Sequence, residues 1–226
     1  MKTKGIILIL TVLLFSSCIV KSLQPFYIKD SLSFNKALLG NWTDNKKGQW
    51  TVEAIKDKFE EDRKEGVELS EEDLLFLDTY KKGYYIKLVS KEKEAGFIAM
   101  PFLINEQYFL DFIPLEIEDD EINSLAAQHL LKTHSVAKLD IESDTKVSFS
   151  WLSEKPIGQL FDENQIRLKH EKIGIEEDLL LTASSKELYA FLDKFMKSNV
   201  KNKWGEDTNK KTSSDRFTLT RTNAKP

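Results

Sequence analysis

Residues 96–113 read GFIAMPFLINEQYFLDFI, which predicts two strands joined by a tight turn at Asn105-Glu106. Successive side chains of a strand point to opposite faces of a sheet. Both faces of the first strand are apolar, with Phe97, Ala99 and Leu103 on one face and Ile98, Met100, Phe102 and Ile104 on the other. A sheet with one face in water would not tolerate this pattern, so we expect other elements to cover the outer face.

Short alternating segments recur along the rest of the chain and predict a mainly β protein. We expect further strands at 38–43, 48–55, 83–90, 133–142, 145–152, 165–171, 178–183 and 216–221. Nine or ten antiparallel strands in sequential hairpins either close into a barrel or leave long exposed edges. We therefore predict an antiparallel barrel of nine or ten strands, with a two-sheet β-sandwich as the alternative.

About three helices are expected to pack outside this barrel, near residues 70–82, 119–132 and 184–198. Ser70 with Asp73 and Ser184 with Glu187 have the spacing of capping boxes. The last helix carries an apolar stripe at helical spacing. By contrast, the charged residues 56–65 are interpreted as a solvated loop.

The N-terminus has the layout of a secretory signal peptide. Lys2 and Lys4 precede an aliphatic run, residues 5–15, that is too short to span a bilayer, and Ser16-Ser17 stand directly before Cys18. This ending resembles the lipobox of bacterial lipoproteins, with Phe15 in the place of the usual Leu. The resemblance implies cleavage before Cys18, acylation of Cys18 by palmitate-type chains, and attachment to the outer membrane.

We therefore predict a signal peptide over 1–17, a lipid-anchored tether over 18–33 and a single domain over 34–226. Some members of the lipoprotein family reach the cell surface through an acidic cluster just after the cysteine. Here the next acidic residue after Cys18 is Asp30, so the resemblance implies the periplasmic face rather than the cell surface. Cys18 is also the only cysteine, so disulfides, thiol redox chemistry and cysteine zinc sites are excluded from the mature domain. Cleavage would change the net charge from −4 to −6, which does not suit a nucleic-acid-binding protein.

Residues 38–42, LLGNW, resemble the opening of the lipocalin barrel, where Gly-x-Trp lies on the first strand. The resemblance implies that Trp42 plugs one end of a lipocalin-like barrel. It also implies that an Arg near the end of the domain lies across the Trp ring. Arg221 fits by strand parity because it shares a face with Phe217 and Leu219.

Catalytic and metal sites have no recognisable motif in this chain, so we expect no enzyme activity, no cofactor and no metal. His129, His170 and Asp111 fall among apolar residues and could together form an acid–base or metal site. The simpler interpretation is that each His bonds a backbone group and that Asp111 faces solvent. His134 is expected to be exposed. The acidic residues 116–121 are expected to place negative charge at the N-terminus of the following helix, where it is favourable, rather than to bind calcium.

Trp50, Tyr84 and Trp151 face the predicted barrel interior by parity and could line a cavity for a small hydrophobic ligand. Our first hypothesis is therefore a lipid-anchored binding module, whose partners are the membrane and this ligand. The alternative is a structural lipoprotein with a solid barrel that docks an unidentified envelope protein. An uncharacterised enzyme is the third hypothesis.

Overall fold

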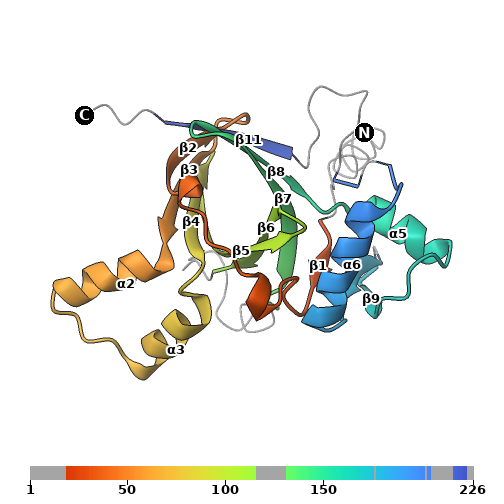
Figure 1. The fold of residues 1–226 in the computed structure, drawn as a ribbon, viewed down its shortest axis with the longest axis horizontal. Coiled ribbons are helices and arrows are strands. Elements are labelled where there is room, and N and C mark those ends of the chain that lie inside the picture. Colours follow the sequence, from red (N-terminus) through yellow and green to blue (C-terminus); the bar gives the residue numbers. More distant parts are fainter. Residues whose placement is uncertain (1–18, 116–130, 176, 202, 205–215, 223–226) are drawn as a thin grey trace, which may run out of the picture.

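The structure is a computed structural model that describes residues 19–115, 131–175, 177–201, 203–204 and 216–222 (Figure 1). Eight antiparallel strands form its main body. Each is bonded to two neighbours, since β6 pairs with β7 and β11 lies between β8 and β2. These strands are β2 (Gly40–Asp44), β3 (Gln49–Ala54), β4 (Tyr84–Ser90), β5 (Lys93–Ile104), β6 (Gln107–Pro114), β7 (His134–Ser143), β8 (Lys146–Trp151) and β11 (Arg216–Arg221).

The ring of pairings confirms the predicted antiparallel barrel, which has eight strands rather than nine or ten. The other three described strands form a small sheet beside it. β1 (Lys21–Ser22) pairs with β7 and β10 (Asp178–Leu181), and β10 pairs with β9 (His170–Ile173). The strand predicted over 165–171 is wrong for residues 165–169, which have no strand assignment in the structure.

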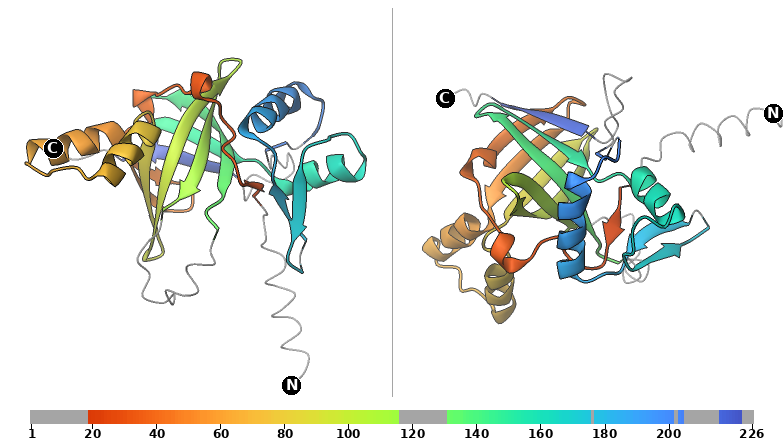
Figure 2. Two further views of the ribbon diagram at one scale, coloured as in Figure 1. Left: turned by 90° about the horizontal axis from the view of Figure 1, so that it is seen from below. Right: turned by 45° about the vertical axis from the view of Figure 1, so that its right-hand side comes forward.

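The four α-helices of the described residues flank the barrel, two on each side (Figure 2). α3 (Glu71–Tyr80) and α6 (Ser185–Lys197) begin at the two predicted capping boxes, which are both formed. The helix expected over 119–132 falls almost entirely on 116–130, outside the described residues. The remaining described helices are α2 (Ile55–Lys64), α5 (Glu154–Asp162) and the short 3₁₀ turns η1 (Lys29–Ser31) and η2 (Lys36–Leu38).

α2 corrects the interpretation of residues 56–65 as a loop. Ile55 and Phe59 lie one turn apart, and the Phe59 ring packs 5.8 Å from the ring of Phe76 on α3. Lys56 pairs with Glu60 at 3.3 Å across one helical turn. The helix forms because the outer face of β4 and β5 gives its apolar residues a surface to bury, which the local charge pattern does not reveal.

The β5–β6 hairpin is covered on both faces, as its sequence predicts. Ala99, Leu110 and Phe112 point into the barrel interior. On the outer face, Phe102, Ile104 and Phe109 pack under α5 and α6, and Ile98, Met100 and Ile113 pack under α2 and α3. One sheet therefore separates an interior core from two outer cores.

Residues 19–33 do not form the free tether that we expected. Val20 and Phe26 are fully buried, and the backbone of Val20 bonds to Leu152 at 3.1 Å. Ile19 also bridges to Ser153. The chain is thus fixed to the domain from the first described residue, because its alternate side chains enter the core under α5 and α6.

Candidate functional site

Trp42 and Arg221 lie together at one end of the barrel, as predicted. The Trp42 side chain is fully buried, and the Arg221 guanidinium carbon lies 4.2 Å from the centre of its ring. Arg221 also donates to the carbonyl oxygens of Ala37, Leu39 and Asp144 at 2.8–2.9 Å. Gly40 has a φ of +114°, and a Cβ there would lie 2.7 Å from Nη1 of Arg221. The glycine thus permits both the strand conformation and the close approach of the arginine.

The three predicted ligand-binding aromatics all point into the barrel, where other side chains surround them. Trp50 packs 5.1 Å from the ring of Phe149, and Trp151 packs 4.6 Å from that of Phe112. The Trp50 N–H donates to Asp44 at 2.7 Å. The Tyr84 hydroxyl donates to the Asn35 carbonyl and accepts its backbone N–H, both at 2.8 Å. Trp50 and Tyr84 therefore have no free polar atom to offer a ligand.

The candidate cluster of His129, His170 and Asp111 is not assembled by the described residues. His170 bonds the Leu168 carbonyl through Nδ1 at 3.0 Å and lies over the Phe161 ring, as the simpler interpretation expected. His129 and residues 116–121 lie outside the described part of the chain. Within that part, no group of three His, Cys, Asp or Glu residues is close enough to hold a metal ion.

Asp111 instead pairs with His134, which corrects two expectations. Asp111 is fully buried rather than solvent-facing, and His134 is only 15% exposed in its side chain. Nδ1 of His134 lies 2.6 Å from Oδ1 of Asp111, and the Phe26 N–H donates to Oδ2 at 2.7 Å. Burial raises the pKa of the Asp111 carboxyl, opposed by these two contacts. The pair fastens the N-terminal segment to the barrel wall.

Replacing Asp111 by asparagine should give a variant whose stability, compared with that of the wild-type protein, increases as the pH rises. The raised pKa means that folded Asp111 keeps a proton that the unfolded chain releases above the ordinary carboxyl pKa of 3.8. The resulting stabilisation is complete below that pH and is lost as the pH rises through the folded pKa. The asparagine side chain is neutral throughout.

Melting temperatures of both proteins between about pH 4 and pH 7 test this expectation. The variant minus wild-type difference should increase with pH, whereas Asp57→Asn on the exposed face of α2 should show no such trend. A difference that decreases with pH would mean that folding lowers, rather than raises, the pKa of Asp111.

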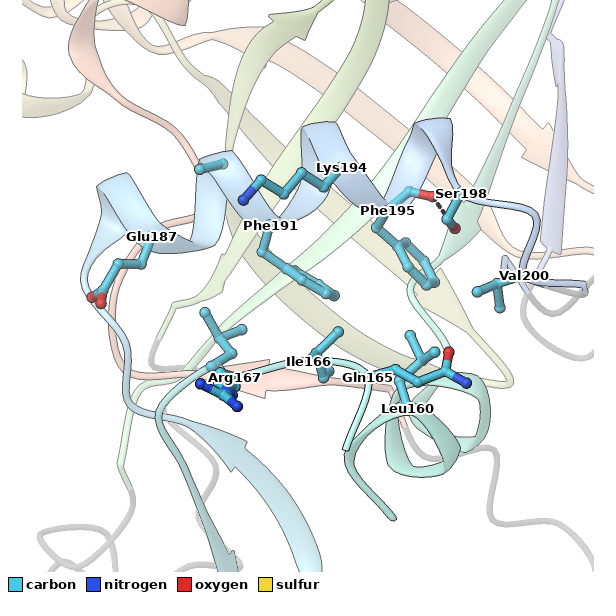
Figure 3. Close-up of a pocket in the computed structure, with 12 residues that line it drawn as sticks. Leu160, Gln165, Ile166, Arg167, Glu187, Phe191, Lys194, Phe195, Ser198 and Val200 are labelled. Atoms are coloured by element: carbon cyan, nitrogen blue, oxygen red, sulfur yellow. Dashed lines mark hydrogen bonds between the residues drawn. The ribbon is translucent and has the colours of Figure 1, made fainter. Parts of the chain in front are cut away.

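A groove of about 480 Å³ lies between α6 and the chain that leaves α5 (Figure 3). α6 buries Leu188 and Leu192 completely toward the barrel, and it turns Phe191 and Phe195 toward the opposite wall. That wall consists of Leu160 at the end of α5 and the extended residues 165–168, where Ile166 and Leu168 are half-buried. The groove is thus mostly apolar and has the size of a small-molecule site.

Charged side chains gather at one end of this groove. Lys194 and Glu187 lie on α6 and Arg167 lies on the opposite wall, whereas Phe195 and Val200 line the other end (Figure 3). Glu187 accepts bonds from the backbone N–H and hydroxyl of Ser184, which hold the pKa of its carboxyl below the ordinary value. Glu187 is therefore occupied as the helix cap, whereas Lys194 and Arg167 lie on the two walls at this end of the groove.

The sequence interpretation did not find this groove, although it contained two signals. Ile166 and Leu168 alternate with polar residues, which led us to extend a strand over them. The apolar stripe of α6 is wide because Phe191 and Phe195 flank Leu188 and Leu192. A stripe of that width can touch two surfaces, but only the folded chain shows that the second surface is this extended segment.

Two further hollows lie at the α2–α3 hairpin. One, of about 190 Å³, lies between the helices and the barrel and is lined by Phe59, Phe76 and Tyr85. The other lies at the tip of the hairpin beside Val67 and Leu74, which are both exposed. The hairpin projects away from the barrel on the side opposite the groove (Figure 2).

Comparison with known proteins gives no relative: no family model, no curated protein and no solved structure matches this chain. A search of the described residues for membrane-spanning helices finds none that is both long and apolar enough.

Proposed function

We propose that this protein is a lipid-anchored envelope protein that binds a small hydrophobic ligand in the groove under α6, without catalysis. The observation that carries the proposal is the groove itself, because about 480 Å³ of space is lined mainly by apolar side chains. Both walls of the groove, α6 and the chain after α5, pack against the outer core that lies between these helices and the barrel. Such a preformed site costs a ligand little reorganisation.

The anchor part of the proposal rests on the sequence that ends at Cys18. Acylation there would place the protein at the outer membrane, with the periplasmic face favoured by the lack of acidic residues before Asp30. Because Ile19 already bridges to Ser153 at the start of α5, the lipid would be attached next to the folded domain. The side of the molecule formed by α5 and α6, which contains the groove, would then lie close to the membrane.

We place the ligand in the groove rather than in the barrel for a physical reason. Trp50 and Tyr84 have bonded polar atoms, and the rings of Trp50 and Trp151 pack against Phe149 and Phe112. A ligand in the barrel would have to displace these contacts. In the groove, Phe191 and Phe195 stack on each other and line the cavity.

The alternative proposal, a structural lipoprotein that docks an envelope protein, is favoured by a different observation. Leu74 and Leu75 on α3 and Val67 before it are 47–70% exposed, on a hairpin that projects from the barrel. Exposed apolar residues on a projecting element are typical of a protein contact. The packed aromatic rings inside the barrel are equally compatible with this alternative.

Tryptophan fluorescence, titrated with fatty acids of increasing chain length, tests the binding proposal. Trp204 lies 6.3 Å from the ring of Phe195, so a ligand in the groove should change its emission. Affinity should rise about fourfold for each added CH₂ until the groove is filled. Trp204→Phe should abolish the response, whereas Trp50→Phe and Trp151→Phe should retain it.

Ile166→Asn provides the blocking variant, because it places an amide on the groove wall and should weaken binding at least about tenfold. Ile173→Asn makes the same substitution at an exposed position of β9 and serves as the matched control. A response that survives Trp204→Phe but disappears in Trp50→Phe would move the site into the barrel. No response to any chain length would favour the docking alternative.

A further inference from the structure

The groove has a charged end and an apolar end, and this polarity indicates the kind of ligand that it suits. Lys194 and Arg167 stand on opposite walls at the charged end (Figure 3). Phe195, Leu160 and Val200 line the other end. A ligand that filled the groove would therefore meet cations with one part and hydrocarbon with the rest.

The acidic groups near these two cations already have partners. Glu187 holds the N-terminal cap of α6 through Ser184. Asp193 pairs with Lys197 at 2.8 Å and accepts a bond from Asn105. Among the described residues, neither Arg167 nor Lys194 takes part in an ion pair or a side-chain hydrogen bond. Two cations at the mouth of an apolar groove are thus left available to an anion.

We propose that the ligand is an anionic amphiphile with a single acyl chain, bound with its carboxylate between Arg167 and Lys194. This proposal rests on the function proposed above and adds the head group and the direction of the chain. The chain would run along Phe191 and Phe195 toward Val200, where its methylene groups lose contact with water. Arg167 offers the planar fork of donors that matches a carboxylate, and Lys194 offers a mobile charge.

Three ligands with the same hydrocarbon chain and different head groups separate the contribution of the head group to binding from that of the hydrocarbon. Dodecanoate, dodecanol and dodecylamine are titrated against the wild-type domain below their aggregation concentrations, with Trp204 emission as the readout. Two partly exposed ion pairs should make dodecanoate bind about tenfold more tightly than dodecanol. Dodecylamine should bind more weakly than dodecanol because like charges repel, and added salt should reduce both differences.

The double variant Arg167→Gln with Lys194→Gln should remove the preference for dodecanoate and leave dodecanol binding unchanged. Lys186→Gln with Lys201→Gln removes the same charge from exposed positions outside the groove and should keep the preference. All four residues are exposed, so neither variant should disturb folding.

The outcomes distinguish the two proposals. Equal binding of dodecanoate and dodecanol, or a preference that survives the double groove variant, would overturn the assigned head group while the hydrophobic groove stands. A higher affinity for dodecylamine than for the other two ligands would overturn the assigned head group as well. Failure of all three ligands to bind would overturn the groove function itself.

Discussion

Trp42→Ala is expected to lower the free energy of unfolding by about 3–5 kcal/mol. The indole is fully buried, and its N–H donates to the Leu38 carbonyl at 2.9 Å. Its removal would leave a cavity at the end of the barrel and would take away the ring against which Arg221 lies at 4.2 Å. Urea unfolding of the full domain measures the change directly.

A double-mutant cycle with Arg221→Ala separates the cavity from the contact. Because the two residues touch, Trp42→Ala should cost less in the Arg221→Ala background than in the wild-type protein. Trp42→Phe keeps a ring but loses the indole donor, so it serves as the milder control. Its free energy of unfolding should lie between those of the wild-type protein and Trp42→Ala. A loss below about 1 kcal/mol for Trp42→Ala would contradict a role of this residue in closing the barrel.

Cys18→Ala is expected to abolish lipidation and, with it, attachment to the membrane through acyl chains. Without the thiol no acyl chain can be attached, and stable anchoring requires at least two chains. The variant should accumulate as an uncleaved precursor or as a soluble protein, which immunoblotting of membrane and soluble fractions distinguishes.

Ser17→Ala is the matched control because it keeps a small residue before the cysteine and should be processed and anchored like wild type. Normal processing of Cys18→Ala together with membrane association would show that the lipoprotein interpretation is wrong. The protein would then be held at the membrane by other means.

Local sequence determined those features that depend on one segment or on strand parity. The apolar pattern of residues 96–113 predicted a sheet covered on both faces, and the capping boxes at Ser70 and Ser184 located the starts of two helices. The lipocalin resemblance implied an arginine across the Trp42 ring, and strand parity selected Arg221 as that arginine. These predictions succeed because hydrogen-bond satisfaction at a helix start and the alternation of a strand are properties of a few neighbouring residues.

Features that depend on distant partners could not be predicted from the segments themselves. α2 is a charged stretch that forms a helix because Ile55 and Phe59 pack against the outer face of the barrel. His134 has the sequence context of an exposed residue, yet the β6–β7 pairing brings it to Asp111. In both cases the stabilising contacts are made with residues far along the chain, which local propensity does not encode.

The same distinction applies to the candidate site. The sequence determined the barrel, the amphipathic character of α6 and the aromatic residues that could line a site, and it placed those aromatics inside the barrel by parity. Only the tertiary structure decided that their rings and polar atoms are used in packing, and that the groove lies outside, between α6 and residues 160–168. A cavity is the space left after distant elements have packed, so its position depends on how those surfaces fit together rather than on any one segment.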